Sequence, residues 1–132
     1  MERLFVDTSA WFAHANRDDP RHRDVADVLC GFMGRLVTTN FVFDETITLC
    51  VYRLGHRVAT SVGAVLLDPE EVELVRLTAN DERSAWQLFS GRADKEYSFT
   101  DCTSFVVMRR LGITTAASLD EDFVREGFRA VP

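Results

Sequence analysis

The sequence has no long hydrophobic run, few cysteines and almost no lysine, and the first two shortages each exclude a class of protein. No window approaches the roughly 18 consecutive apolar residues of a membrane-spanning helix. The amino terminus enters a strand-like pattern at once, without the basic and then apolar segments of a secretory signal peptide. These absences predict a protein of the cytoplasm that has no membrane association.

The cysteines and histidines are too scattered to predict a disulfide framework or a zinc site. The cysteines are Cys30, Cys50 and Cys102. They are odd in number and each lies in an apolar helical context, so we expect all three to be buried as small hydrophobic residues. The three histidines fall on different segments of the chain, where a surface or capping role suits each of them.

The composition is that of one globular domain with an acidic balance. The 132 residues are 46% hydrophobic and 27% charged, and no linker or repeat divides them, so we expect a single domain over residues 1–132. The net charge of -6 argues against a nucleic-acid partner unless several acids surround a bound cation. The bases are fourteen arginines and Lys95. Arginine suits phosphate contacts, although genome composition produces the same bias.

Short apolar runs alternate with helical patterns along the whole chain. We expect strands at 3–6, 36–39, 72–77, 113–117 and 128–131, and helices at 9–16, 22–32, 40–54, 57–67, 80–89, 100–111 and 121–125. Asn40 is a suitable N-cap for the third helix, and Gly55 and Gly112 are suited to end helices. This alternation predicts an α/β fold, a three-layer α/β/α sandwich with a central parallel sheet of four to five strands.

Four acidic residues lie near the carboxyl ends of the predicted strands, where such sheets bind ligands. Asp7 and Asp120 each follow a strand directly, Glu45 lies on the helix after the second strand, and Asp101 begins the helix before the fourth. Asp7 and Asp120 are equally suited to cap helices, and Asp101 forms a capping-box pattern with Ser98. Taken one at a time, these positions leave a structural role open.

Glu45 is harder to explain by a structural role. Helical spacing aligns it with Phe41 and Leu49 on an apolar stripe that should face the core, and no Lys or Arg lies within one turn of it. Four converging carboxylates would repel one another by about 4 kcal/mol per close pair at an effective dielectric near 20. Protons or a bound cation would remove this repulsion, and for a cation oxygen ligands select a hard ion such as Mg²⁺ or Mn²⁺.

Four sequence blocks resemble the motifs of PIN-domain ribonucleases, particularly the VapC-type toxins of toxin–antitoxin pairs. The blocks are FVDTSAW (5–11), TTNFVFDE (38–45), YSFTDCTSF (97–105) and AASLDEDF (116–123). Their joint order and spacing cover essentially the whole chain. The resemblance implies a PIN-like sheet and a Mg²⁺-dependent endoribonuclease whose products carry a 5′-phosphate and a 3′-hydroxyl.

The same resemblance implies a role for each acid. Asp7 and Asp101 would be the principal metal ligands. Glu45 would complete the ligand set or orient a metal-bound water, and Asp120 would lie at the rim. Because Glu121 and Asp122 crowd the fourth block, the sequence leaves open which of these three neighbouring acids faces the pocket.

Three polar residues are candidates to support the acids. Thr8 or Ser9 would hold the Asp7 carboxylate or a scissile phosphate through its hydroxyl group. Asn40 would do likewise, although capping of its helix is the alternative role for this residue.

The resemblance also implies three partners: an RNA substrate, a cognate antitoxin and a second copy of the chain in a homodimer. An antitoxin segment would occupy an apolar groove lined by Trp11, Phe12, Phe32 and Met33, although these residues equally suit the core. If four of the acidic residues lie in the pocket, seventeen acidic residues remain on the rest of the protein against fifteen basic residues. This nearly neutral balance no longer argues against RNA as a partner. Candidate phosphate contacts are Arg17, Arg21, Arg23, Arg109 and Arg110.

Other readings of the first motif fit less well. A haloacid dehalogenase-type phosphatase requires a second Asp two residues after the first, and Ser9 stands there. A receiver domain requires paired acids and a lysine after a late strand, whereas Asp7 is single and Lys95 lies elsewhere. The remaining alternative is an inactive PIN scaffold that binds RNA or a protein partner, and the presence of all four acids argues against it.

Overall fold

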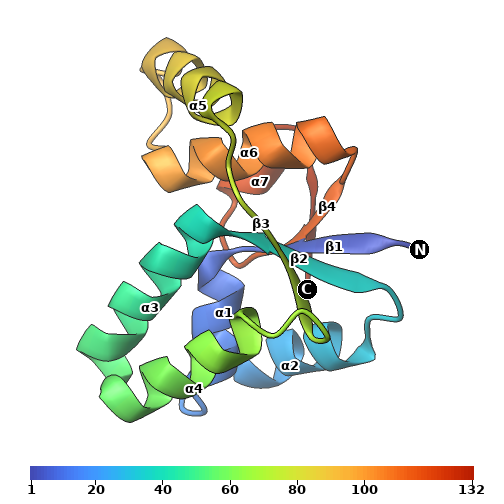
Figure 1. The fold of residues 1–132 in the computed structure, drawn as a ribbon, viewed down its shortest axis with the longest axis vertical. Helices are drawn as coiled ribbons and strands as arrows, with labels where there is room; N and C mark the ends of the chain where they lie inside the picture. Colours follow the sequence, from blue (N-terminus) through green and yellow to red (C-terminus); the bar gives the residue numbers. More distant parts are fainter.

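A parallel five-stranded sheet forms the centre of the computed structural model, which describes residues 1–132. The strands are β1 (Arg3–Val6), β2 (Arg35–Thr39), β3 (Val72–Val75), β4 (Thr115–Ala117) and β5 (Arg129–Val131). The helices are α1 (Thr8–Ala15), α2 (His22–Gly31), α3 (Asn40–Leu54), α4 (His56–Leu66), α5 (Ala79–Gly91), α6 (Phe99–Leu111) and α7 (Asp122–Arg125). Helices α1 to α4 lie on one side of the sheet and α5 to α7 on the other (Figure 1).

The strand order is β3-β2-β1-β4-β5, with all neighbours parallel. The three-layer sandwich is therefore confirmed, and every predicted element is present with ends that differ by at most two residues. Strand β1 lies at the centre because its side chains are apolar on both faces, and Leu4, Phe5 and Val6 are all buried. None of the helices is both long and apolar enough to cross a lipid bilayer.

The start of α3 differs from the prediction at Asn40. Thr39 is the N-cap, since its backbone is extended and its hydroxyl oxygen accepts a hydrogen bond from the Val42 amide at 3.1 Å. Asn40 is already helical, and its side-chain oxygen accepts a hydrogen bond from the Leu77 amide at 2.9 Å. Asn40 therefore ties α3 to the segment after β3.

One prediction about buried residues is wrong in part, and the two roles left open for Trp11 are resolved. Cys30 is exposed in the last turn of α2, because Val25 and Leu29 form the face of that helix that packs against the core. Cys50 and Cys102 are buried as expected. Trp11 belongs to the core and not to a groove, and its indole N–H donates to the Thr38 hydroxyl at 3.2 Å.

Strand pairing brings together two segments that lie far apart in the sequence. The Asp7 amide donates to the Ala117 carbonyl at 3.0 Å, so the residues after β1 and β4 are neighbours at the carboxyl edge of the sheet. Helix α6 begins near the same edge, at a capping box formed by Ser98 and Asp101. This edge is where the predicted acids meet.

Candidate functional site

An acidic pocket of about 430 Å³ opens at the carboxyl edge of the sheet. It is lined by Asp7, Thr8, Ser9, Glu45, Leu49, Glu96, Ser98, Asp101, Asp120 and Asp122. All four predicted acids are among these residues, and two further acids join them. No Lys or Arg lines the pocket, so its charge has no counter-charge within the lining.

Asp7 occupies the N-cap position of α1 but makes no capping hydrogen bond with its side chain. Its Oδ2 instead accepts hydrogen bonds from the hydroxyl groups of Ser9, at 2.9 Å, and Ser118, at 3.0 Å. Each serine oxygen in turn accepts a backbone N–H from the segment after β4, which leaves its own proton available for Asp7. The two serines therefore hold one carboxylate oxygen and leave the other outside their reach.

Burial raises the pKa of Asp7 to about 6, although the hydrogen bonds from Ser9 and Ser118 favour the ionised form and reduce the shift. No basic side chain forms an ion pair with this carboxylate. Asp7 is thus a buried acid without a basic partner in the protein, an environment in which a bound cation would favour its ionised form.

Asp101 serves the helix and the pocket at once. Its Oδ2 accepts the Ser98 amide at 3.0 Å while the Ser98 hydroxyl oxygen accepts the Asp101 amide at 3.0 Å, so the predicted capping box is present. Burial, together with the charges of Asp7, Asp120 and Asp122, raises the pKa of Asp101 to about 7. The capping role and the convergence with other acids are therefore compatible.

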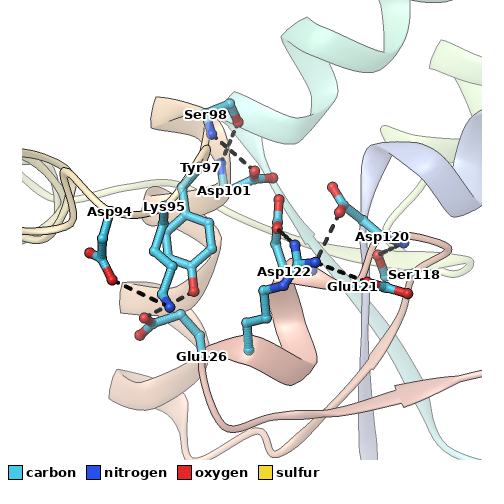
Figure 2. Close-up of polar contacts among 11 residues, drawn as sticks. Asp94, Lys95, Tyr97, Ser98, Asp101, Ser118, Asp120, Glu121, Asp122 and Glu126 are labelled. Atoms are coloured by element: carbon cyan, nitrogen blue, oxygen red, sulfur yellow. Dashed lines mark hydrogen bonds and ion pairs between the residues drawn. The ribbon is translucent and has the colours of Figure 1, made fainter.

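The structure decides which acids of the fourth block face the pocket. Carboxylate oxygens of Asp101, Asp120 and Asp122 lie within 4.8 Å of one another, and Figure 2 shows these side chains facing a common space. The Glu121 side chain is 81% exposed and pairs with Arg125 at 3.0 Å. Asp120 and Asp122 therefore belong to the pocket, and Glu121 does not.

Ser118 was not among the predicted site residues, and Asp122 was one of the three neighbouring acids among which the sequence did not decide. Asp122 accepts a hydrogen bond from the Arg125 guanidinium at 3.0 Å, which leaves its second oxygen free of that contact. Its only signal in the sequence is the spacing of two residues from Asp120, across a turn in which the Asp122 amide donates to Asp120 at 3.3 Å. Ser118 likewise lies two residues from Asp120, on its amino-terminal side.

The remaining candidates divide between the pocket and other positions. Glu45 is half-buried and lines the pocket together with Leu49, so the stripe that the sequence assigned to the core borders the pocket instead. Thr8 also lines it, and the Thr8 hydroxyl oxygen is buried without a hydrogen-bond partner. Asn40 is not part of the lining, because its side chain contacts Leu77.

Two of the arginines considered as phosphate contacts are held by acids. Arg109 pairs with Glu126 at 2.8 Å and lies over the Phe128 ring at 5.0 Å. Arg110 donates to both carboxylate oxygens of Asp81, at 2.8 and 2.7 Å. These side chains stabilise contacts between helices, and their charge is already matched.

The donor set fits a divalent cation. The pocket offers carboxylate and hydroxyl oxygens and no nitrogen or sulfur ligand, which is the preference of a hard ion. The unpaired Thr8 hydroxyl and the raised pKa values of Asp7 and Asp101 show that the protein alone does not satisfy these groups. The sheet and the pocket thus define an α/β protein with an acidic cluster that could hold a metal ion at the carboxyl edge of its strands.

The chain belongs to the PIN-domain family, whose conserved pattern matches residues 4–128. Over 125 residues it is 40% identical to a Mycobacterium tuberculosis protein described as the 23S rRNA-specific endonuclease VapC20, covering 95% of each chain. It is 31% identical over 118 residues to a VapC ribonuclease of Archaeoglobus fulgidus, covering 80% of this chain and 70% of that one.

Solved structures agree with this assignment. The crystal structure of M. tuberculosis VapC20, described as a sarcin-ricin loop cleaving toxin, matches with a TM-score of 0.91 at 39% identity over 95% of each chain. FitAcB from Neisseria gonorrhoeae matches with a TM-score of 0.71 at 12% identity, over 98% of this chain and 96% of that one. At that identity the second match supports the fold alone.

Proposed function

We propose that the protein is a Mg²⁺-dependent endoribonuclease that acts as the toxin of a toxin–antitoxin pair. The observation that carries this proposal is the convergence of carboxylates from the ends of β1 and β4, the first turn of α6 and the start of α7 on one pocket whose lining has no basic residue. The similarity to VapC ribonucleases over nearly the whole chain supports the choice of RNA as substrate. We place the protein in the cytoplasm, where RNA is available to it.

Asp7, Asp101, Asp120 and Asp122 hold the metal in this proposal. Their mutual repulsion is relieved when a cation binds, so Asp7 and Asp101 bind it as carboxylates despite their raised pKa values. When bound, the ion lowers the pKa of a coordinated water and neutralises charge that develops on the scissile phosphate. Since no basic side chain lines the pocket, that neutralisation cannot come from the protein.

Glu45 and Thr8 act on the water and the substrate. Glu45 lines the pocket without an ion-pair partner, and its carboxylate orients the attacking water. The Thr8 hydroxyl is buried and unpaired at the pocket wall, where a rotation of its side chain would let it donate to a phosphate oxygen, while Ser9 is already committed to Asp7. The water oxygen forms a bond to phosphorus and the bond from phosphorus to the 3′ oxygen breaks, which leaves a 5′-phosphate and a 3′-hydroxyl.

The direct test is to incubate the purified protein with RNA and Mg²⁺ and to map the products. We expect internal cleavage with 5′-phosphate ends, and its loss when EDTA removes the metal. The first substrate to test is 23S rRNA, because that is the substrate named for the M. tuberculosis relative. RNA binding without cleavage at any Mg²⁺ or Mn²⁺ concentration would favour the inactive-scaffold alternative.

Ser118 is a positioning residue in this scheme. Replacing Ser118 with alanine removes a donor to Asp7 and the acceptor of the Asp120 amide, so metal affinity and the cleavage rate should each fall by roughly 10- to 100-fold. Calorimetric titration with Mn²⁺ measures the affinity. Ser61→Ala, at an exposed position of α4, serves as the matched control. Unchanged metal affinity in Ser118→Ala would remove this residue from the scheme.

An antitoxin and a second copy of the chain complete the proposal. Of the residues suggested for an antitoxin groove, Met33 is exposed, Phe12 and Phe32 are half-buried, and Trp11 lies in the core. If the toxin assignment is correct, expression of the protein should arrest growth. A short protein encoded beside it should then relieve the arrest and co-purify with it.

A further inference from the structure

A row of four aromatic rings leads from the outer face of α5 toward the acidic pocket. Trp86 stacks on Phe89, with ring centroids 5.9 Å apart and an interplanar angle of 26°. Phe89 meets Phe99 edge to face at 6.1 Å, and Phe99 meets Phe41 at 6.2 Å. This aromatic row therefore connects α5 to α3 through α6, which borders both of these helices (Figure 1).

The inner end of the row lies beside the pocket. Phe99 directly follows Ser98 and lies two residues before Asp101, and both of these line the pocket. Phe41 lies one helical turn before Glu45 on α3, which places the two side chains on the same face of that helix. The row therefore ends among the residues proposed to hold the metal and the attacking water.

The outer end of the row is open to solvent. Trp86 is 59% exposed and Phe89 is 38% exposed, whereas the other tryptophan of the chain, Trp11, is buried. Exposing two stacked aromatic rings leaves apolar surface in water that the core could have covered. Such an arrangement indicates a ligand that presents flat apolar faces.

We propose that the aromatic row is a stacking platform that binds unpaired bases of the RNA whose backbone enters the acidic pocket. This inference rests on the proposed ribonuclease function. Proteins read single-stranded RNA by stacking its bases on aromatic side chains, and every base has a face that can stack. The platform holds bases within a few nucleotides of the phosphate that is cut.

The charges around the pocket favour a source of RNA affinity that does not depend on charge. The lining is acidic, so before metal binds it repels phosphate groups. Arg109 and Arg110, the arginines of α6, are paired with Glu126 and Asp81. Stacking on uncharged rings supplies binding energy that does not depend on neutralising the backbone.

The surroundings of Trp86 favour RNA over a second copy of the chain. The exposed neighbours on α5 are polar or charged, namely Glu82, Arg83, Ser84, Gln87 and Ser90. A stable homodimer buries about 800 Å² per partner around a largely apolar centre, which two exposed rings on a polar helix do not provide. A nucleobase has an apolar face, which matches the exposed rings, and polar edges, which match the polar side chains around them.

Tryptophan fluorescence provides a direct test, since the chain has only two tryptophans and Trp11 is buried. A short single-stranded RNA is titrated into the Asp7→Asn protein, which is used to prevent cleavage, in the presence of Mg²⁺. We expect binding to quench the fluorescence of Trp86. In this background, Trp86→Ala should bind the RNA about 5- to 100-fold more weakly, measured by anisotropy of a labelled RNA, while Trp86→Phe retains most of the affinity.

Two controls separate stacking from other effects. Tyr52→Ala removes a ring that is 83% exposed on α3 outside the row, and it should leave RNA affinity unchanged. An RNA of the same length with abasic nucleotides should bind Trp86→Ala and its parent equally, because it has no bases to stack. Equal affinity of Trp86→Ala and its parent for normal RNA would overturn the proposal.

Cleavage kinetics and the oligomeric mass of Trp86→Ala distinguish RNA binding by the aromatic row from a protein interface. In the protein with native Asp7, Trp86→Ala should raise KM by the factor by which it weakens RNA binding and should leave kcat unchanged. The reason is that the stacking energy is the same for the bound substrate and for the transition state. A lower oligomeric mass of Trp86→Ala in sedimentation experiments would make the row a protein interface and overturn the proposal. Quenching by RNA without cleavage by the native protein would support the platform and contradict the ribonuclease function.

Discussion

Replacing Asp7 with asparagine is expected to reduce RNA cleavage by at least about 100-fold and to leave the fold intact. The amide oxygen of asparagine can accept the two hydrogen bonds that Ser9 and Ser118 donate to Asp7, so the segment after β4 keeps its position. The neutral amide, however, removes a negative charge from the site where the cation binds. Initial cleavage rates at matched Mg²⁺ and protein concentrations measure the effect.

The matched control for this variant is Glu121→Gln. It removes one negative charge from the neighbouring turn, but the Glu121 side chain is exposed and points away from the pocket (Figure 2). Its cleavage rate should stay within about twofold of the native rate, because an exposed charge is screened by solvent and salt. Cleavage by Asp7→Asn at the native rate would remove Asp7 from the mechanism.

In the absence of metal, the protein should lose stability as the pH rises from about 4.5 to about 7.5. Burial raises the pKa of Asp7 from 3.8 to about 6 and that of Asp101 from 3.8 to about 7, so the folded protein resists their ionisation. Their contribution is favourable below pH 4 and is lost as the pH passes through the raised values. For Asp7 alone the full loss is about 3 kcal/mol, of which about 2 kcal/mol falls above pH 4.5. Denaturant unfolding in EDTA across this range measures it.

Two other buried acids make the protein more stable as the pH rises, but their effect lies below the pH range in which the pocket acids ionise. Burial opposes ionisation of Glu126, yet hydrogen bonds from Arg92 and Arg109 outweigh it and hold the pKa of Glu126 below its usual value. Arg110 has the same effect on Asp81. The stability from these pairs is complete above about pH 4.5 and is lost only as the pH falls further. The decline at higher pH therefore reports on the pocket.

Metal should reverse this decline. At pH 7.5, Mg²⁺ or Mn²⁺ at 100 times its dissociation constant should stabilise the protein by about 2.7 kcal/mol. Asp101→Asn keeps an oxygen for the Ser98 amide, so it should flatten the pH dependence and weaken the response to metal without loss of the helix cap. A native protein with the same stability at both ends of the range, and with no response to either ion, would contradict the metal site.

Much of the fold could be predicted from local patterns. Helices and strands follow apolar spacing and the capping signals near their ends, as at Ser98 and Gly112, where the observed boundaries agree with the prediction. Thr39 and Asn40 show the limit of this reasoning. Both residue types cap helices, and the extended backbone at the end of β2 selects Thr39.

The composition of the pocket was predictable only in part. Asp7, Glu45, Asp101 and Asp120 lie near strand ends, and the carboxyl ends of parallel strands share one edge, so their meeting follows from the sequence once a parallel sheet is assumed. The choice among three consecutive acids does not follow. It depends on the turn into α7, which directs Asp122 inward and leaves Glu121 beside Arg125.

The sequence by itself determined the alternation of strands and helices, the parallel sheet and the positions of four acids, because these depend on periodicity and on short-range hydrogen bonds. Only the tertiary structure decided how the acids are held. The contact of Ser118 with Asp7 joins residues 111 positions apart and exists because β4 pairs with β1. The two hydroxyl residues of the first motif also differ in their contacts: Ser9 donates a hydrogen bond to Asp7, and the Thr8 hydroxyl has no hydrogen-bond partner.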